Sequence, residues 1–100
     1  MIKHVVMFKI KDLAEGSNKE ENIQKIKSSL EALPTMIHEI KLFEVGINLT
    51  NSSFAYDLVL NSAFESEEDL FSYQGHPEHV KVADFVGKVC ESRTVVDYIL

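Results

Sequence analysis

The most informative stretch of the chain is residues 73–79, which read Tyr73-Gln74-Gly75-His76-Pro77-Glu78-His79. Proline is tolerated in the first turn of a helix, because its missing N–H would have no partner there. We therefore predict that a helix begins at Pro77, with His76 as its N-cap and His79 inside the first turn. Tyr73 would lie at the end of the helical segment that precedes this one. A phenol and two imidazoles thus gather at one helix N-terminus, where they can donate hydrogen bonds or move protons near pH 7.

Hydrophobic spacing on either side of this segment predicts alternating strands and helices. We expect strands over residues 2–11, 36–49, 54–62 and 94–99, and helices over residues 18–33, 66–73 and 77–91. The first helix has a predicted capping box formed by Ser17 and Glu20. The order is β-α-β-β-α-β, with the second helical region split. This order predicts an α+β, ferredoxin-like fold, in which one antiparallel four-stranded sheet carries its helices on one face.

Composition limits the classes of function. One hundred residues form one small domain, residues 1–100. Sixteen acidic residues against ten basic ones give a net charge of -6, which argues against a nucleic-acid partner. No apolar run approaches the length of about 20 residues needed to span a membrane. The single cysteine, Cys90, cannot form an intrachain disulfide, and the first residues alternate as a strand and lack the features of a signal peptide. We expect a cytoplasmic protein.

The predicted strands are apolar on both faces. In the third strand, for example, Leu58 and Leu60 oppose Ala55 and Val59. Two crossover helices cover only one face of such a sheet, and an exposed apolar patch of more than a few hundred Å² is unusual on a monomer. We therefore expect a homodimer in which two sheets pack face to face and enclose a barrel-like core.

Three segments together resemble the stress-responsive dimeric α/β-barrel (Dabb) family. They are Lys3-His4-Val5-Val6 in the first strand, Tyr73-x-x-His76-Pro77-x-His79, and the terminal Val95-Val96-Asp97-Tyr98. The resemblance covers essentially the whole chain and implies a dimer of ferredoxin-like subunits. Most of the family has no assigned reaction. Its best-understood branch comprises plant polyketide cyclases, which close a linear tetraketide-CoA by a C2–C7 aldol step.

The resemblance also implies site residues. The catalytic pair of the cyclase branch matches Tyr73 and His79 at the same spacing, and its N-terminal strand histidine matches His4. A further histidine of the third strand is replaced here by Asp57, a departure from the branch. Together with His76, these residues are the candidates for lining a ligand pocket.

Some members of the family bind a divalent ion through backbone carbonyls after the first helix. Leu30, Leu33 and Met36 have the matching spacing. A site made only of carbonyl oxygens leaves no side-chain signature in a sequence, so the resemblance alone carries this implication.

An aldol cyclisation needs a base that removes a proton next to a carbonyl, and a donor that holds the enolate oxygen. His79 suits the base, because imidazole titrates near neutral pH and the positive end of a helix disfavours imidazolium. Tyr73 suits the donor, because its phenol stays protonated. His4 would orient the ligand or His79 from the pocket floor. This chemistry requires no metal and no organic cofactor.

Structural interpretations stand beside this one. His76 can act purely as a cap, Tyr73 and His79 can pack between the split helices and the sheet, and a histidine such as His4 on an apolar face is commonly a satisfied core residue. Asp97 and Tyr98 end a strand, where hydrogen bonding and packing explain them adequately.

Three function classes therefore remain. The first is a cofactor-independent acid–base enzyme acting on a small apolar carbonyl ligand. The second is a stress-related ligand-binding or structural protein without turnover. The third is a small monooxygenase that oxidises heme or quinols, ranked last because the chain has no tryptophan and no heme-ligand pattern.

Overall fold

The computed structural model describes residues 1–100, and its element order confirms the ferredoxin-like prediction. The elements are β1 (Ile2–Ile10), β2 (Leu13–Ala14), β3 (Ser17–Asn18), α1 (Lys19–Glu31), the 3₁₀ helix η1 (Leu33–Thr35), β4 (Leu42–Ile47), β5 (Leu58–Phe64), α2 (Glu67–Gly75), α3 (Pro77–Val89) and β6 (Cys90–Ile99). The small β2–β3 hairpin is an addition to the predicted β-α-β-β-α-β order. No helix combines the length and the apolar character that crossing a membrane would require.

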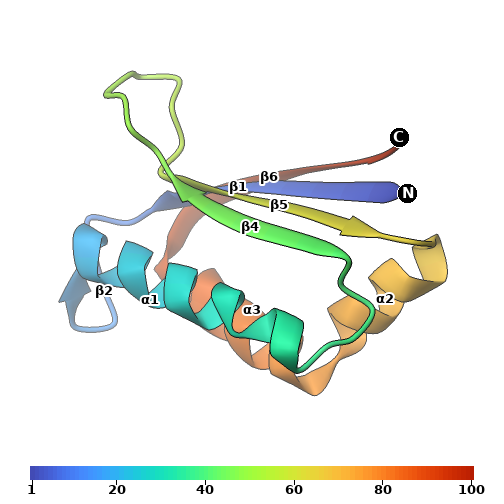
Figure 1. The fold of residues 1–100 in the computed structure, drawn as a ribbon. Coiled ribbons are helices and arrows are strands. Elements are labelled where there is room, and N and C mark those ends of the chain that lie inside the picture. Colours follow the sequence, from blue (N-terminus) through green and yellow to red (C-terminus); the bar gives the residue numbers. More distant parts are fainter.

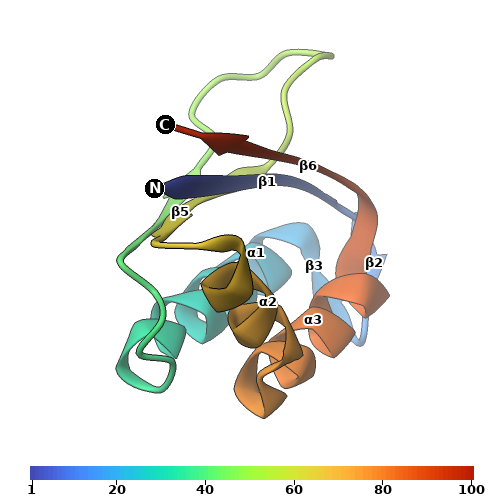
Figure 2. The same ribbon diagram turned by 90° about the vertical axis from the view of Figure 1, so that its right-hand side faces the viewer.

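The four long strands form one antiparallel sheet in the order β4-β5-β1-β6. The helices all lie on one side of this sheet, as Figures 1 and 2 show. Strand β1 is central, and its alternate residues His4, Val6, Phe8 and Ile10 are buried against the helices. Residues directly opposite one another on neighbouring strands share a face, so the register of β1 assigns the faces of β5 and β6 as well.

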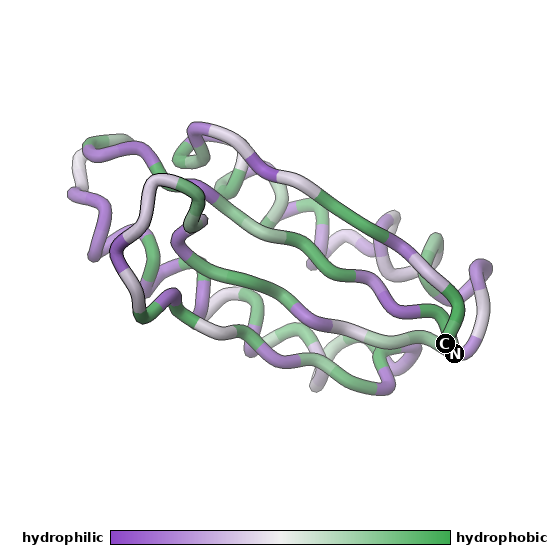
Figure 3. Tube along the Cα trace, turned by 90° about the horizontal axis from the view of Figure 1, so that it is seen from above, coloured by the Kyte–Doolittle hydropathy of each residue, from purple (hydrophilic) through white to green (hydrophobic).

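The other face of the sheet is left bare by the helices and carries many apolar residues, with polar ones such as Lys3, Glu44 and Asn61 among them. Val5 pairs with Val96, and Met7 pairs with Val59, so these four residues point away from the helices. Val96 is 54% exposed and Met7 is 42% exposed. Figure 3 looks onto this side of the molecule, where apolar stretches run along the strands. The sequence-based expectation that the chain cannot cover both faces of its sheet matches this arrangement.

The capping box of the first helix lies one residue later than predicted. Asn18 is the N-cap, because its side chain accepts a hydrogen bond from the Glu21 N–H at 2.9 Å and the Glu21 carboxylate accepts from the Asn18 N–H at 3.1 Å. Ser17 belongs to strand β3, where its buried hydroxyl accepts a hydrogen bond from Lys25. The Ser17/Glu20 capping box was therefore wrong by one position.

Two predicted strands begin later than expected. Strand β4 begins at Leu42, and strand β5 begins at Leu58. Between them, residues 48–57 form a long loop that rises past the bare side of the sheet (Figure 1). Phe54 is 92% exposed in this loop, and its N–H donates to the Ser52 hydroxyl at 3.2 Å. Such local turns compete with strand pairing, and strand propensity alone does not reveal them.

Candidate functional site

The junction between α2 and α3 positions the two principal site residues. Helix α2 ends at Gly75 and α3 begins at Pro77. His76 is the N-cap of α3, as predicted, and its Nδ1 accepts a hydrogen bond from the Glu78 N–H at 3.1 Å. The change of direction at this junction brings Tyr73 of one helix and His79 of the next together, with ring centroids 4.5 Å apart.

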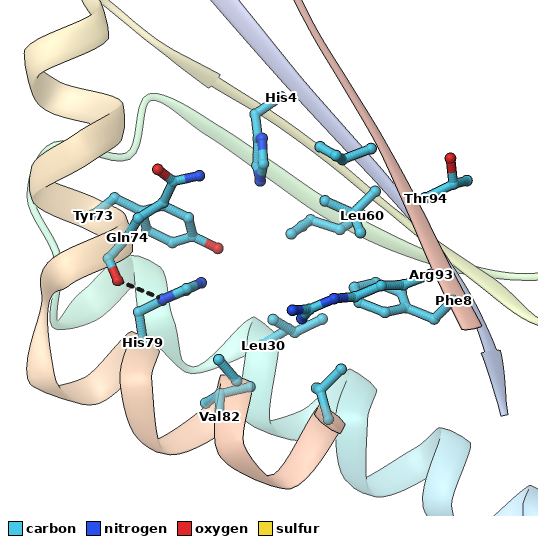
Figure 4. Close-up of a pocket in the computed structure, with 14 residues that line it drawn as sticks. His4, Phe8, Leu30, Leu60, Tyr73, Gln74, His79, Val82, Arg93 and Thr94 are labelled. Carbon is cyan, nitrogen blue, oxygen red and sulfur yellow. Dashed lines mark hydrogen bonds between the residues drawn. The ribbon is translucent and has the colours of Figure 1, made fainter. Parts of the chain in front are cut away.

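A cavity of about 390 Å³ lies between the sheet and the three helices. Fourteen residues line it, of which nine are hydrophobic and none is acidic. Tyr73, His79 and His4 are among them, so the structure brings these three predicted residues to one cavity. Figure 4 shows His4 entering from the sheet and the other two from the helix side.

The Tyr73 hydroxyl is buried and lacks a hydrogen-bond partner. Its ring is fixed by Phe43 and Phe64, whose centroids lie 5.9 Å and 5.0 Å away. Figure 4 shows the hydroxyl directed into the cavity. Burial raises the pKa of the phenol above its ordinary value, so Tyr73 remains protonated at neutral pH. A buried donor without a partner is costly, and a ligand oxygen in the cavity would satisfy it.

His79 is held in one tautomer by the end of α2. Its Nδ1 lies 2.9 Å from the carbonyl oxygen of Gln74. A carbonyl oxygen can only accept, so Nδ1 carries the proton and Nε2 is left with a lone pair. Burial lowers the pKa of the imidazole, the hydrogen bond to Gln74 opposes this, and the nearby His4 and Arg93 lower it further. His79 is therefore neutral at pH 7, with one nitrogen able to accept a proton.

His4 is oriented by a carboxylate across the sheet. The two residues His4 and Asp97 are direct partners in the β1–β6 pairing, and the His4 Nδ1 lies 2.5 Å from the Asp97 Oδ1. The Nδ1–H donates to the carboxylate, so Nε2 is the ring nitrogen that remains for the cavity. The His4 ring lies 6.2 Å from that of Tyr73. Sequence reasoning gave Asp97 only a structural role in hydrogen bonding and packing, because its partner becomes visible only once the register of the two strands is known.

Two of the predicted pocket residues lie outside the cavity. The His76 ring is engaged by the first turn of α3, as described above. Asp57 comes just before β5, where its carboxylate accepts the Ile10 N–H at 2.7 Å and lies 3.8 Å from the Lys19 ammonium. Both side chains are committed to structural hydrogen bonds, which explains why neither of them faces the cavity.

One of the three carbonyls implied as ligands of a divalent ion is already engaged within the protein. The carbonyl oxygen of Leu33, the middle one of the set with Leu30 and Met36, accepts hydrogen bonds from the N–H groups of Met36 and Ile37, both at 2.9 Å. Both lone pairs of this oxygen are thus occupied. We assign no metal to this segment.

Arg93 is a cavity residue that sequence reasoning missed. It lies on β6 opposite Phe8, on the face that points toward the helices. Figure 4 shows its guanidinium extending into the cavity. The predicted last strand began at Thr94, whereas β6 begins at Cys90, so Arg93 fell outside the alternation that would have assigned it to this face.

Fold and site together define a protein of the ferredoxin-like class, with a small cavity between sheet and helices. The chain matches the family described as Stress responsive A/B Barrel Domain over residues 2–100, and it belongs to that family. This finding confirms the resemblance noted in the sequence.

Similar proteins fall in the same family or fold. A stress-response A/B barrel domain-containing protein of Arabidopsis thaliana is 34% identical over 99% of this chain, and the match spans 36% of the length of that relative. Olivetolic acid cyclase of Cannabis sativa is 26% identical, over 97% of this chain and 94% of its own. A crystal structure from Bacteroides fragilis has a TM-score of 0.83 and 34% identity, covering 99% of this chain and 95% of that one. It is described as a dimeric protein of unknown function with a ferredoxin-like fold.

Proposed function

We propose that this protein binds a small, mainly apolar carbonyl compound in the cavity and catalyses a cofactor-independent acid–base reaction on it. The observation that carries the proposal is the pairing of a protonated phenol with a neutral imidazole on one cavity. The Tyr73 hydroxyl has no partner of its own, and the His79 Nε2 has a free lone pair. The similarity to olivetolic acid cyclase supports a cyclisation of aldol type.

The two groups suit the two halves of such a reaction. The His79 Nε2 removes a proton from the carbon next to a carbonyl, and the Tyr73 hydroxyl donates a hydrogen bond to the enolate oxygen that forms. The carbanion carbon then attacks a second carbonyl of the same ligand, which forms a C–C bond. The imidazolium returns its proton to the new alkoxide, so no electron leaves or enters the system. A positioned base contributes about a hundred- to ten-thousandfold in rate.

The second candidate is ligand binding without turnover, and Asp57 favours it. This residue stands where the resembling cyclases have a further histidine, and its carboxylate is tied to the Ile10 N–H. The cavity therefore lacks one polar group of that branch, while its mainly hydrophobic lining still suits an apolar ligand.

We propose further that the protein acts as a homodimer through the bare face of its sheet. The apolar residues Val5, Met7, Val96 and Tyr98 on this face, and the dimeric state given for the B. fragilis structure, support this assembly. The loop 48–57 rises on the same side, which would bring its exposed Leu49 and Phe54 beside a second copy. A specific interface buries about 800 Å² per partner.

The first experiment screens linear polyketone and aromatic carbonyl compounds for binding and turnover. Wild type is compared with His79→Gln and Tyr73→Phe, both close in size to the residues that they replace. Turnover in wild type that is lost in both variants, with binding kept, supports the enzyme. Binding in all three proteins without turnover in any favours the binding protein, and no binding to wild type contradicts the proposal.

A further inference from the structure

Arg93 places a positive charge in a cavity that holds no negative one. The chain as a whole has a net charge of -6, yet none of the fourteen residues around the cavity is an aspartate or glutamate. Arg93 is the one lining residue with a permanent positive charge. The local charge of the cavity is thus opposite in sign to that of the whole protein.

The Arg93 guanidinium has no partner within the protein. It takes part in none of the ion pairs of the structure and in none of the side-chain hydrogen bonds. Asp97 does not line the cavity, and its carboxylate is engaged by the His4 Nδ1 at 2.5 Å. Arginine carries five N–H donors in a planar fork that matches a carboxylate. These donors are therefore available to a molecule in the cavity.

The position of Arg93 separates this charge from the acid–base pair. Arg93 lies on β6 at the level of Phe8, whereas Tyr73 and His79 belong to the helix junction. Figure 4 shows the guanidinium reaching into the same cavity from the sheet side, facing the His79 ring and the apolar side chain of Leu30. Arg93 is close enough to His79 to lower the pKa of the imidazole. One small ligand in the cavity can therefore contact Arg93 and the Tyr73/His79 pair at the same time.

We propose that the ligand of this cavity is an apolar carboxylate, whose anionic group is bound by Arg93 while its carbonyl-bearing part lies at Tyr73 and His79. This inference rests on the proposed function, because it names the substrate class for the same cavity. Arg93 is a specificity-determining residue in this arrangement. It selects acids over neutral compounds of the same shape, and it takes no part in proton transfer.

The test uses a matched pair of probes, 4-phenylbutanoate and its neutral analogue 4-phenylbutanamide, titrated against the full chain by calorimetry. Wild type is expected to bind the acid about tenfold more tightly than the amide, since only the acid forms a charge-assisted hydrogen bond with the guanidinium, and solvent screens this bond in part. Arg93→Gln should remove this preference and leave amide binding unchanged. Lys88→Gln, the same charge change at an exposed position of α3 outside the cavity, should leave both affinities unchanged.

The possible failures are distinct. Equal affinities for acid and amide in wild type would overturn the role of Arg93 while leaving the apolar cavity intact. If Lys88→Gln lost as much acid binding as Arg93→Gln, the preference would depend on the overall charge of the protein. That result would also overturn the specific role of Arg93. Binding of neither probe would contradict the ligand-binding proposal itself, and the carboxylate inference with it.

Discussion

The Nδ1 atom of His79 donates its hydrogen to the carbonyl oxygen of Gln74 across 2.9 Å, joining the first turn of α3 to the end of α2. The last carbonyls of a helix have no partner within it, so this bond satisfies a group that would otherwise need water. The same bond fixes which imidazole nitrogen is left for the cavity. The sequence order of tyrosine, helix break and histidine thus sets both the position and the tautomer of the base.

We expect His79 to titrate below the ordinary histidine pKa of about 6.5, because burial disfavours its charged form. Turnover that depends on the neutral imidazole should then rise with pH through this lowered pKa and level off near neutrality. NMR titration of the ring, identified by the spectrum of His79→Gln, measures the pKa directly. An inflection above 6.5, or activity that increases as the solution becomes acidic, would contradict a neutral base.

The same shift has a consequence for stability. The unfolded chain binds a proton at His79 near pH 6.5, whereas the native state binds it only at lower pH. The unfolded state therefore holds more protons in this window, so the free energy of unfolding should decline as pH falls below 6.5. Urea denaturation of wild type and His79→Gln at several pH values tests this: the decline should be shallower in the variant.

Replacing Tyr73 by phenylalanine should separate stability from function. The Tyr73 hydroxyl is buried without a partner, so its removal takes away an unsatisfied group and leaves the packing against Phe43 and Phe64 in place. We expect Tyr73→Phe to be unchanged in stability or more stable by about 1 kcal/mol, while turnover is lost. Thermal or urea unfolding beside an activity assay measures both.

The matched control is Tyr73→Ala, which removes the ring as well. It should cost about 3–5 kcal/mol, because it leaves a cavity in the aromatic cluster. If Tyr73→Phe destabilised the protein by as much as ~2 kcal/mol, the hydroxyl would have a structural partner, and its proposed role as an available donor would fail.

Much of this architecture could be predicted from the sequence, and the exceptions have identifiable causes. Helix starts at Pro77 and after Ser66 follow from local chemistry, since a proline or a capping side chain acts within one turn. The cap at Asn18 was missed because both Ser17 and Asn18 can cap, and in the structure the Ser17 hydroxyl accepts from Lys25 while the Asn18 side chain accepts from the Glu21 N–H.

Apart from His4, which the family resemblance supplied, the site was predictable only where it depends on neighbours in sequence. Tyr73 and His79 lie within one short segment, so their meeting follows from the helix break between them. Arg93 reaches the cavity through the register of β6 with β1, which pairs it with Phe8 from the opposite end of the chain, and the same register pairs Asp97 with His4. No local pattern encodes that register, and a misplaced start of the last strand was enough to leave Arg93 out.

Asp97 should act on the site through His4. Asp97→Asn keeps the size of the side chain but weakens the charge-assisted hydrogen bond that holds the His4 ring. We expect turnover to fall about tenfold and stability to fall by about 1 kcal/mol or less, since the carboxylate is 45% exposed. Asp84→Asn, the same change at an exposed position of α3, should alter neither quantity.

A double-mutant cycle distinguishes positioning from packing in this pair. If Asp97 works only by orienting His4, then His4→Gln combined with Asp97→Asn should be no less active than His4→Gln alone. Fully additive losses in the double variant would show that Asp97 acts on the reaction by a route that does not pass through His4.

The bare face of the sheet should hold two copies of the chain together. Val96 lies in the middle of β6, pairs with Val5 and points away from the helices, where it is 54% exposed. In a face-to-face dimer its side chain would be buried. A carboxylate at this position would then lose its hydration without gaining a hydrogen-bond or ionic partner. Val96→Asp should therefore turn a dimer into a folded monomer at micromolar concentration, as measured by sedimentation.

Val80→Asp is the matched control for this experiment. Val80 is 44% exposed, close to the value for Val96, but it lies on α3 on the opposite side of the molecule from the bare face. The substitution adds the same charge at a similar starting exposure, so it should leave the dimer intact. Circular dichroism of both variants verifies that the fold is kept. A wild-type chain that sediments as a monomer at micromolar concentration would contradict the dimer outright, and dissociation by Val80→Asp alone would locate the interface on the helical side of the molecule.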